Sequence, residues 1–273
     1  FLDISASIIQ GSGIGPAAYV VNAADLKAVT PDNTMCKYAD DTYLIIPAKN
    51  IDSRGAELQN VETWAKDNNL ALNRSKSTEI IFVDRRRKRR HEVNQPLPVP
   101  GIARVTSLTI LGVTITNNLS MAEHVRGLIS KCAATLYALR VLRAHGMCNT
   151  ALHSIYRSVA VAKIQYAVSS WWGFTTASDR QRIDAFFRRS IRYGYCPPDL
   201  PTFSKLCEVA DERLFDSILM NPDHTLHHLL PPPSVASQNY SLRSRPHNRE
   251  LPEHAGRLSD SNFINRLLYE NIY

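Results

Sequence analysis

The hydrophobic pattern of this 273-residue chain changes its period near residue 118. Before that point, apolar residues form short alternating or β-branched runs separated by Gly, Pro and Asp, which is typical of strands and turns. After it, they recur every three or four residues, which is typical of amphipathic helices. The change predicts an α+β fold, in which an antiparallel sheet with packed helices precedes a helical region and a C-terminal extension. We expect the divisions to fall at 1–118, 119–195 and 196–273.

The first part is predicted to contain a strand, a glycine-rich turn, a helix and a β-hairpin within residues 1–49. Three glycines between Gln10 and Pro16 permit positive φ angles, and residues 17–26 are good or neutral helix formers. Ala39-Asp40-Asp41 lies between two strand-like runs, 35–38 and 42–46, which is a hairpin signal. Further on we expect a helix at 52–69, a short strand at 78–83 and a strand-like segment at 107–116 centred on Leu111-Gly112.

The later part is predicted to contain at least four helices. Ser120 with Glu123 forms a capping-box pattern at the start of the first, Thr150 is a candidate cap for the second and Ser178 for the third. The second helix should turn Leu152, Ile155, Val159 and Ile164 inward. The third, 178–192, should bury Ile183, Phe186, Phe187 and Ile191 and leave its arginines largely outside. A last short helix is expected at 260–272.

Composition excludes several classes of protein. A hydrophobic content of 44% is too high for a disordered chain, and no apolar run is long enough for a membrane-spanning helix. Phe1 is followed by no leader-like pattern, and five scattered cysteines favour a reducing compartment, so we expect the nucleus or the cytoplasm. The spacing of Cys196 and Cys207 favours buried thiols over a zinc site with the nearby histidines. A net charge of +7 favours polyanionic partners.

The segment Tyr38-Ala39-Asp40-Asp41 is the candidate chemical centre. Two adjacent carboxylates repel each other unless a cation lies between them. Two divalent ions about 4 Å apart activate a nucleophile and stabilise a leaving group. The alternative is an ordinary turn, in which each aspartate bonds the local backbone.

A run of six cations has three interpretations. It contacts nucleic-acid phosphates, or it directs nuclear import, or it is a solvated loop. The run consists of Arg85, Arg86, Arg87, Lys88, Arg89 and Arg90. The arginines of 178–192 likewise suit either a duplex backbone or a merely exposed helix face.

Several motifs together resemble the reverse transcriptases of non-LTR retrotransposons of the jockey type. Tyr38 to Asp41 looks like the family's palm hairpin, and Gln10-Gly11-Ser12 with Gly15-Pro16 looks like its nucleotide-pocket turn. Leu72-Asn73-x-x-Lys76, followed by residues 79–82, looks like the next palm motif, and residues 108–113 look like the primer-grip hairpin. Residues 166–172, 221–233 and 262–266 are similar to its C-terminal region, so the resemblance covers nearly the whole chain.

The resemblance implies a partial palm followed by a helical thumb. Asp40 would coordinate both metals, Mg²⁺ or Mn²⁺, and Asp41 would support the site. Gln10, Gly11, Ser12 and Tyr38 would bind nucleotide and template, and Leu111 with Gly112 would form the primer grip. Lys76 would lie near the phosphates, unless it is a solvated lysine before a strand.

By the same resemblance, the partners are an RNA template, a DNA primer and deoxynucleoside triphosphates. The family's metal site includes a further aspartate on an earlier strand, and only nine residues precede Gln10. We therefore expect a C-terminal palm-and-thumb fragment without templated synthesis of its own. The alternative is a non-enzymatic, basic nucleic-acid-binding remnant of a retroelement. An unrelated metal-dependent phosphohydrolase would need further carboxylates and histidines around Asp40 and Asp41, and no such set is evident in the sequence.

Overall fold

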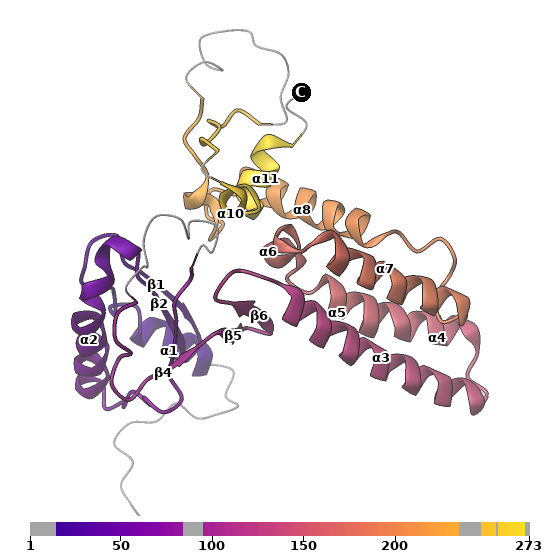
Figure 1. The fold of residues 1–273 in the computed structure, drawn as a ribbon, viewed down its shortest axis with the longest axis horizontal. Coiled ribbons are helices and arrows are strands. Elements are labelled where there is room, and N and C mark those ends of the chain that lie inside the picture. The colour runs from indigo at the N-terminus through magenta and orange to yellow at the C-terminus, as the bar shows by residue number, and fades with distance from the viewer. Residues whose placement is uncertain (1–14, 84–94, 235–246, 255, 271–273) are drawn as a thin grey trace, which may run out of the picture. The chain divides into compact units, whose positions relative to one another are not determined.

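The computed structural model describes residues 15–83, 95–234, 247–254 and 256–270 (Figure 1). The predicted strand before Gln10, the Gln10-Gly11-Ser12 turn and the basic run Arg85–Arg90 lie outside the described residues. The described residues divide into two compact units. The first comprises those within Phe1–Ile81 and Arg86–Val105, and the second those within Phe82–Arg85 and Thr106–Tyr273. The three-part division stays a prediction.

The first unit alternates short strands with helices. Its elements are α1 Gly15–Asn22, β1 Thr34–Tyr38, β2 Asp41–Ile45, the 3-10 helix η1 Ala48–Ser53, α2 Arg54–Asp67, β3 Thr78–Ile80 and β4 Ala103–Val105. The predicted hairpin is confirmed, because β1 pairs antiparallel with β2. The predicted helix at 52–69 corresponds to α2, and the helix at 17–26 begins and ends earlier than expected.

The second unit is a hairpin followed by helices, and Figure 1 shows its long helices side by side. Its first elements are β5 Ser107–Ile110, β6 Val113–Thr116, α3 Ala122–Ala144, α4 Asn149–Ile155, the π-helix η3 Tyr156–Val161 and α5 Ala162–Gln165. The others are α6 Val168–Trp171, η4 Trp172–Phe174, α7 Ala177–Arg192, α8 Phe203–Met220, η5 His227–Leu229, α10 Arg257–Asp260 and α11 Phe263–Tyr269.

The mixed α+β composition is confirmed, but the expected single antiparallel sheet is not found among the described residues. Their strands form three separate two-stranded sheets, and β3 pairs with β4 in parallel. A parallel pair needs a long connection, which the stretch between Ile80 and Ala103 supplies. Across this pair Glu79 binds the Arg104 guanidinium at 2.8 Å, so an ion pair reinforces the short ladder.

An apolar core fills the second unit. It is built from α3, the α4–η3–α5 segment, α7 and α8, and its largest fully buried side chains include Trp171, Tyr156, Phe186 and Phe203. Residues 125, 128, 132, 136 and 139 of α3, which recur every three or four positions, are buried. A smaller cluster joins Phe215 of α8 to Leu267 and Leu268 of α11. No helix of the described stretches has both the length and the apolar character needed to cross a membrane.

The predicted helix caps are wrong. α3 begins after Met121, which makes no capping bond, and the Ser120 hydroxyl accepts only a long bond of 3.4 Å from the Ala122 amide. The Ser120 amide donates to the Thr116 hydroxyl rather than to Glu123, so the predicted capping box does not form. α4 begins after Cys148 rather than at Thr150. α7 begins after Thr176, whose hydroxyl accepts from the Asp179 amide while the Asp179 carboxylate accepts from the Thr176 amide. This reciprocal box starts the helix before Ser178.

The π-helix η3 changes which residues face inward after Tyr156. Val159, predicted to be inside, is exposed, whereas Ala160 and Val161 are buried. In η3 the Ala162 amide bonds to the Arg157 carbonyl five residues back, so one extra residue enters the turn. The extra residue rotates the sequence that follows, and a uniform 3.6-residue period therefore misplaces Val159.

Candidate functional site

The two candidate carboxylates lie at the tip of the β1–β2 hairpin. Tyr38 pairs with Asp41, so Ala39 and Asp40 form the two-residue turn. Ala39 has a φ of 50°, a region that favours glycine in such turns. Residues held in this region cost free energy, and they gather at functional sites. The hairpin therefore presents Asp40 at its most projecting point.

Both aspartate side chains are exposed and only lightly bonded. Asp41 accepts a hydrogen bond from the Tyr43 hydroxyl at 3.3 Å, and the Asp40 carboxylate has no hydrogen bond to another described residue. Burial, followed by the Asp41 charge and its hydrogen bond, raises the pKa of Tyr43. Tyr43 therefore stays a donor at neutral pH, and most of the lone pairs of both carboxylates remain open to a ligand.

The chemistry of these groups suits a hard cation. Mg²⁺ prefers oxygen ligands and is commonly bound by one or two carboxylates, with waters and substrate phosphates completing its shell. The described part of the chain contains no cluster of three His, Cys, Asp or Glu that could hold a metal alone. Asp40 and Asp41 thus fit a metal that takes its remaining ligands from a bound substrate.

Hydrogen bonds to α1 and α2 hold the hairpin in place. Lys37 of β1 donates to the carbonyls of Ala23 and Leu26 just beyond α1. The buried Glu57 carboxylate of α2 accepts from the Val29 and Thr30 amides and from the Asn33 side chain, at 2.8 to 3.1 Å. These bonds fix the segment that leads into β1.

The environment of Glu57 identifies it as a structural group. Burial raises its pKa, but the hydrogen bonds from Asn33, Thr30 and Val29 outweigh burial and leave the pKa below its ordinary value of 4.5. Its charge is satisfied by local donors, so it offers little to a ligand. Glu57 was not predicted from the sequence, because no local pattern distinguishes a buried glutamate from an exposed one.

Lys76 lies at a turn before β3. The Asn73 side chain accepts from the Lys76 amide, three residues on, at 3.1 Å and from the Ser75 hydroxyl at 2.7 Å, so it stabilises the turn. The Lys76 side chain is exposed and makes no hydrogen bond to either aspartate among the described residues. Glu79, in the same motif, is held between Arg54 and Arg104 at 2.6 and 2.8 Å. The motif thus combines an exposed lysine with a firmly paired carboxylate.

The tip of the β5–β6 hairpin is Leu111-Gly112, as predicted. Both residues have positive φ, 46° and 86°, as a type I′ turn requires, although leucine is unusual there. Tyr166, from the region between α5 and α6, donates a hydrogen bond from its hydroxyl to the Leu111 carbonyl at 3.0 Å. A Cβ at Gly112 would meet the Tyr166 ring at 3.4 Å, so the ring lies directly against the turn.

A second contact fixes the other strand of this hairpin. The Thr114 amide donates to Nδ1 of His124 on α3 at 3.2 Å. His124 packs edge-on against Trp171 with ring centroids 4.9 Å apart, and Trp171 donates to the Tyr166 carbonyl. Burial, followed by the charge of Lys131, lowers the pKa of His124, which keeps Nδ1 an acceptor at neutral pH. Two contacts therefore bind the hairpin to the helices of its own unit.

No role was predicted from the sequence for Tyr166, His124 or Trp171. Tyr166 and Trp171 lie in residues 166–172, which resemble the family's C-terminal region, but the resemblance assigns no role to either residue. His124 is an isolated histidine on a helix. Their contacts span 5 to 55 residues along the chain, so only the tertiary structure reveals them.

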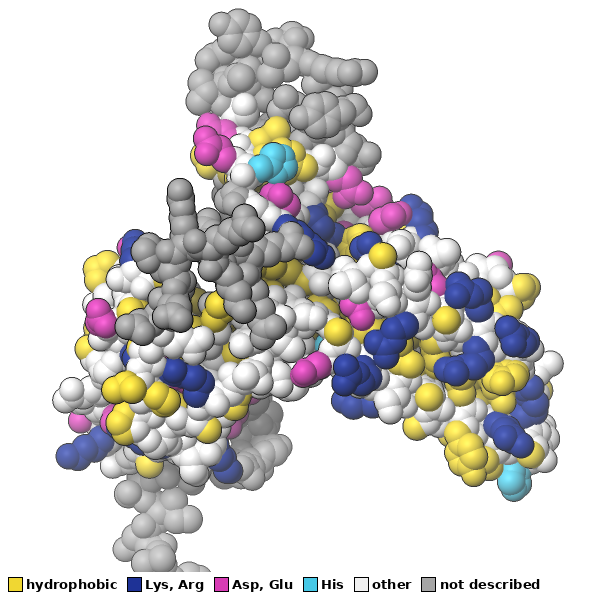
Figure 2. Space-filling model, viewed as in Figure 1, with side chains coloured by type: hydrophobic (Ala, Val, Ile, Leu, Met, Phe, Trp, Pro, Cys, Tyr) yellow, Lys and Arg dark blue, Asp and Glu magenta, His cyan; other side chains and the backbone are white. Residues whose placement is uncertain are grey.

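Basic side chains cover much of the helical unit, and Figure 2 shows them spread over the face that carries α3 and α7. Their exposed members include Arg126, Lys131, Arg140, Arg182, Arg188, Arg189 and Arg192. α7 carries five arginines and two aspartates, and one of those aspartates is the buried Asp179 of the helix cap. This positive surface suits a polyanion.

The candidate residues are divided between the units. Tyr38, Asp40, Asp41 and Lys76 belong to the first unit, and Leu111 with Gly112 to the second. The pairing of Tyr38 with Asp41 brings two of them together directly. Gln10, Gly11, Ser12 and the run Arg85–Arg90 lie in parts of the chain that the structure does not describe.

The structure contains an exposed Asp-Asp hairpin, a second tight hairpin and a basic helical unit, in this order along the chain. The resemblance to reverse transcriptases implies a palm hairpin, a primer-grip hairpin and a helical thumb in the same order. Comparison with known proteins confirms that resemblance: this chain is similar to RNA-directed DNA polymerases of non-LTR retrotransposons.

Three curated relatives, all from Drosophila melanogaster, carry the similarity. The RNA-directed DNA polymerase from mobile element jockey is 27% identical over an alignment of 140 residues, with 45% of this chain and 14% of the relative covered. The probable RNA-directed DNA polymerase from transposon BS is 25% identical over 202 residues, covering 68% of this chain and 22% of the relative.

The probable RNA-directed DNA polymerase from transposon X-element is 24% identical over 203 residues, covering 70% of this chain and 22% of the relative. The matched region thus spans less than a quarter of each relative. No family model matches the chain. No solved structure matches it either.

Proposed function

We propose that this chain forms part of a retrotransposon RNA-directed DNA polymerase, with the β1–β2 turn as its metal-binding element. The observation that carries the proposal is the pair Asp40 and Asp41, exposed at a strained hairpin tip with carboxylate oxygens open to a ligand. Its support is the similarity to three polymerases. The segment up to residue 118 would be part of the palm, 119–195 the thumb and 196–273 an extension.

In this proposal Asp40 and Asp41 hold Mg²⁺, or Mn²⁺ in its place. The metal ions would lower the pKa of the primer 3′-hydroxyl and neutralise charge on the leaving pyrophosphate. Asp40, at the projecting position of the turn, contributes the principal carboxylate. Asp41 contributes a second carboxylate, oriented by the Tyr43 hydroxyl.

Other residues bind and position the substrates. Lys76 presents an ammonium group to the phosphates of a deoxynucleoside triphosphate, and Tyr38 precedes the metal-binding turn. The Leu111-Gly112 turn positions the DNA primer, and the Tyr166 hydroxyl holds this turn in place through its hydrogen bond to the Leu111 carbonyl. Gln10, Gly11 and Ser12 would bind the nucleotide and the RNA template.

The test is a chimera in which the segment of the jockey polymerase that precedes the matched region is fused to this chain. Asp40→Asn should reduce RNA-templated primer extension by about 10²-fold or more, because it removes a preorganised charge while keeping the shape. Asp41→Asn should be no more severe. Asp52→Asn, an exposed aspartate on η1, is the matched control and should leave extension unchanged. If the Asp40→Asn chimera extends the primer nearly as fast as its parent, the β1–β2 turn does not bind the catalytic metal.

A second candidate function is nucleic-acid binding without catalysis. The observation that favours it is the arginine-rich exposed surface of α7. Replacing Arg188, Arg189 and Arg192 by Ser should weaken duplex binding and reduce the slope of log K against log salt by roughly 0.9 for each phosphate that is no longer neutralised. Replacing Arg85–Arg90 in the same way tests the basic run separately. Fluorescence anisotropy measures both, and an unchanged slope means that the replaced residues bind no phosphate.

A further inference from the structure

A segment of the first unit carries alternate prolines just before β4. Residues 95–100 read Gln-Pro-Leu-Pro-Val-Pro, so every one of them is a proline or precedes one. Proline fixes its own φ at about −65° and restricts the residue before it to an extended conformation. These restrictions favour a polyproline II helix, and the structure places neither an α-helix nor a β-strand over these residues. We call residues 95–100 the proline segment.

The exposure of the proline segment repeats every third residue. Pro96 and Val99 are half-buried, whereas Leu97, Pro98 and Pro100 are exposed, and Leu97 is 85% exposed. A polyproline II helix has three residues per turn, so residues three apart lie on the same edge. One edge of the segment therefore faces the first unit. The other two edges face solvent, one with Leu97 and Pro100 and the other with Pro98.

Three arginines hold the proline segment by its backbone carbonyls. The pairs are Arg104 to Pro96 at 2.7 Å, Arg54 to Leu97 at 3.2 Å and Arg74 to Pro100 at 2.9 Å. Carboxylates position these guanidinium groups in turn, since Glu79 pairs with the first two and Glu62 with the third. The contacts use the backbone and leave the exposed side chains free. A partner would meet a segment already fixed in its extended form, which reduces the entropy lost on binding.

A tight turn ends the proline segment. The Ile102 amide donates to the Val99 carbonyl at 3.1 Å, and Gly101 has a φ of 77°. Proline followed by a residue of positive φ is typical of a type II turn, whose first central residue stays extended. Pro100 therefore keeps the conformation of the segment, and the chain turns away only at Gly101.

The chemistry of the exposed edges selects the kind of partner. Prolines have no amide hydrogen, so the segment is a poor strand to add to a partner's sheet. Grooves lined by aromatic side chains instead bind the apolar edges of a preformed polyproline II helix. The three arginines and two glutamates beside the segment leave a surplus of one positive charge. A complementary groove therefore carries acidic residues at its rim.

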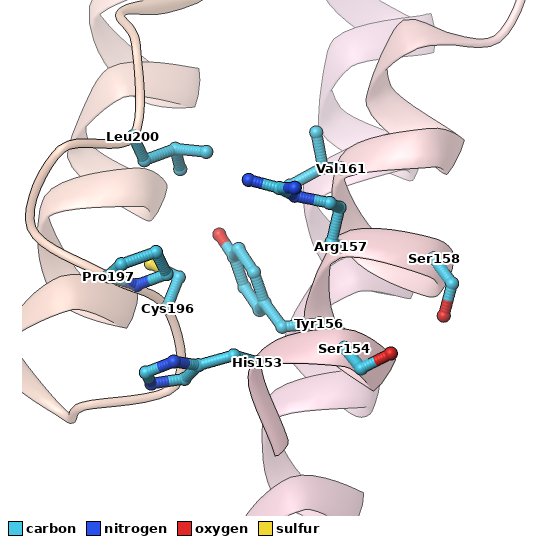
Figure 3. Close-up of a pocket in the computed structure, with 9 residues that line it drawn as sticks. All are labelled: His153, Ser154, Tyr156, Arg157, Ser158, Val161, Cys196, Pro197 and Leu200. Carbon is cyan, nitrogen blue, oxygen red and sulfur yellow. The ribbon is translucent and has the colours of Figure 1, made fainter. Parts of the chain in front are cut away.

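The pocket beside η3 in the second unit offers no comparable surface (Figure 3). Its volume is about 430 Å³, and residues of η3 and of the connection from α7 to α8 line it. Tyr156 is 1% exposed and its ring stacks on Phe186, so its hydroxyl is out of reach of a ligand. Arg157 is the exposed cation of this lining, and a single exposed arginine selects no ligand.

We propose that the proline segment is a docking site for a protein module with an aromatic-lined, acid-rimmed groove. Leu97 and Pro100 enter the groove along one edge and Pro98 along the other, while the arginines face its rim. The proposal is independent of the polymerase assignment, because the segment includes none of the residues proposed to bind metal, nucleotide or primer.

The test titrates the full chain with a panel of purified SH3, WW and EVH1 domains, which bind polyproline II. At least one domain should bind saturably, and its variant with the groove Trp replaced by Ala should bind at least roughly tenfold more weakly. Binding should also weaken as the ionic strength rises from about 0.1 to 1 M, because salt screens the arginines from the rim. No binding by any domain, undiminished binding by the groove variant, or binding that is insensitive to salt overturns the proposal.

Substitutions in this chain locate the contact. Leu97→Ser and Pro98→Ala should each weaken binding of the preferred domain by roughly tenfold, because each removes an apolar group from the groove. Leu229→Ser and Pro222→Ala, at exposed positions of the second unit, are the matched controls and should bind as the parent does. Circular dichroism should be unchanged in all four variants, since the replaced side chains are exposed. Unweakened binding by either segment variant, or equal weakening by its control, overturns the assignment.

Discussion

The two units are stabilised in different ways. Both apolar core clusters lie in the second unit, where Trp171, Phe186 and Leu139 are almost fully buried. Among the described residues of the first unit the buried apolar ones are Ala23, Leu26 and Ala65, while Tyr38, Ile45 and Leu70 are exposed. A fully buried large side chain contributes about 1.5–3 kcal/mol, so apolar burial dominates only in the second unit.

Polar contacts replace apolar burial in the first unit. Ion pairs and hydrogen bonds connect its elements to one another. The ion pairs are Glu79 with Arg54 and Arg104, and Glu62 with Arg74. The side chains of Glu57 and Lys37 add hydrogen bonds to the backbone. Such contacts are directional and respond to pH and salt, whereas apolar burial responds to neither strongly. The candidate metal-binding turn thus lies in the unit with the more condition-sensitive framework.

The largest effect is expected in the apolar core. Trp171→Ala should lower the free energy of unfolding of the second unit by about 3–5 kcal/mol, because it leaves a cavity beside Phe203 and His124. Urea denaturation followed by circular dichroism measures the change. Tyr137→Ala, at a side chain 69% exposed on α3, is the control and should change stability by less than about 0.5 kcal/mol. Equal effects would mean that this core is not the main source of stability.

The next effect concerns the polar framework of the first unit. Glu57→Gln should destabilise the segment around Val29, Thr30 and Asn33 by about 1.5–3 kcal/mol, because the amide keeps only one acceptor oxygen, without charge, and turns an NH2 group toward another donor. Hydrogen exchange of the corresponding peptides should accelerate, with little change in the helices of the second unit. Gln59→Ala, an exposed position on the same helix, should leave that exchange unchanged.

The same residue gives the first unit a pH dependence. Because the folded pKa of Glu57 is lowered, its contribution is complete above about pH 4.5 and is lost as the pH falls through the folded pKa. The protection factors of this segment, which correct for the slower intrinsic exchange at low pH, should therefore fall on acidification in the parent protein, and less so in Glu57→Gln. Identical pH profiles of the two proteins would exclude Glu57 as the titrating group.

A smaller effect separates two candidate caps of α7. Thr176→Ala should cost about 1 kcal/mol, because the Asp179 amide loses its acceptor. Ser178→Ala, at the position that the sequence favoured, should cost less than about 0.5 kcal/mol. Thermal unfolding of both variants decides between them, and the opposite order would contradict the observed box.

The smallest effect is expected at the β5–β6 turn. Tyr166→Phe removes one exposed hydrogen bond to the Leu111 carbonyl and should cost about 0.5–1 kcal/mol. The resulting destabilisation should appear as faster exchange confined to residues 107–116, while the buried helices keep their protection. In the chimeric polymerase the same variant should raise the KM for primer more than it lowers kcat. Unaltered exchange in the hairpin would exclude Tyr166 as its anchor.

Much of the architecture follows from local patterns in the sequence. The hairpins around Asp40 and Leu111-Gly112 follow from short β-branched runs on either side of turn residues, and the buried face of α3 follows from its helical period. The Asp-Asp motif and its relation to retrotransposon polymerases are also properties of the sequence. These features depend on neighbours within a few residues, which a linear pattern records.

Features that depend on residues far apart in the sequence are visible only in the tertiary structure. The parallel pairing of β3 with β4, the burial of Glu57 and the contact of Tyr166 with Leu111 join residues 25 to 55 positions apart. The π-helix at Tyr156–Val161 shifted the buried face by one residue, so that Ala160 and Val161 are buried and Val159 is exposed. Such features arise because buried polar groups take their partners from whichever segment packs against them, and no local period encodes that choice.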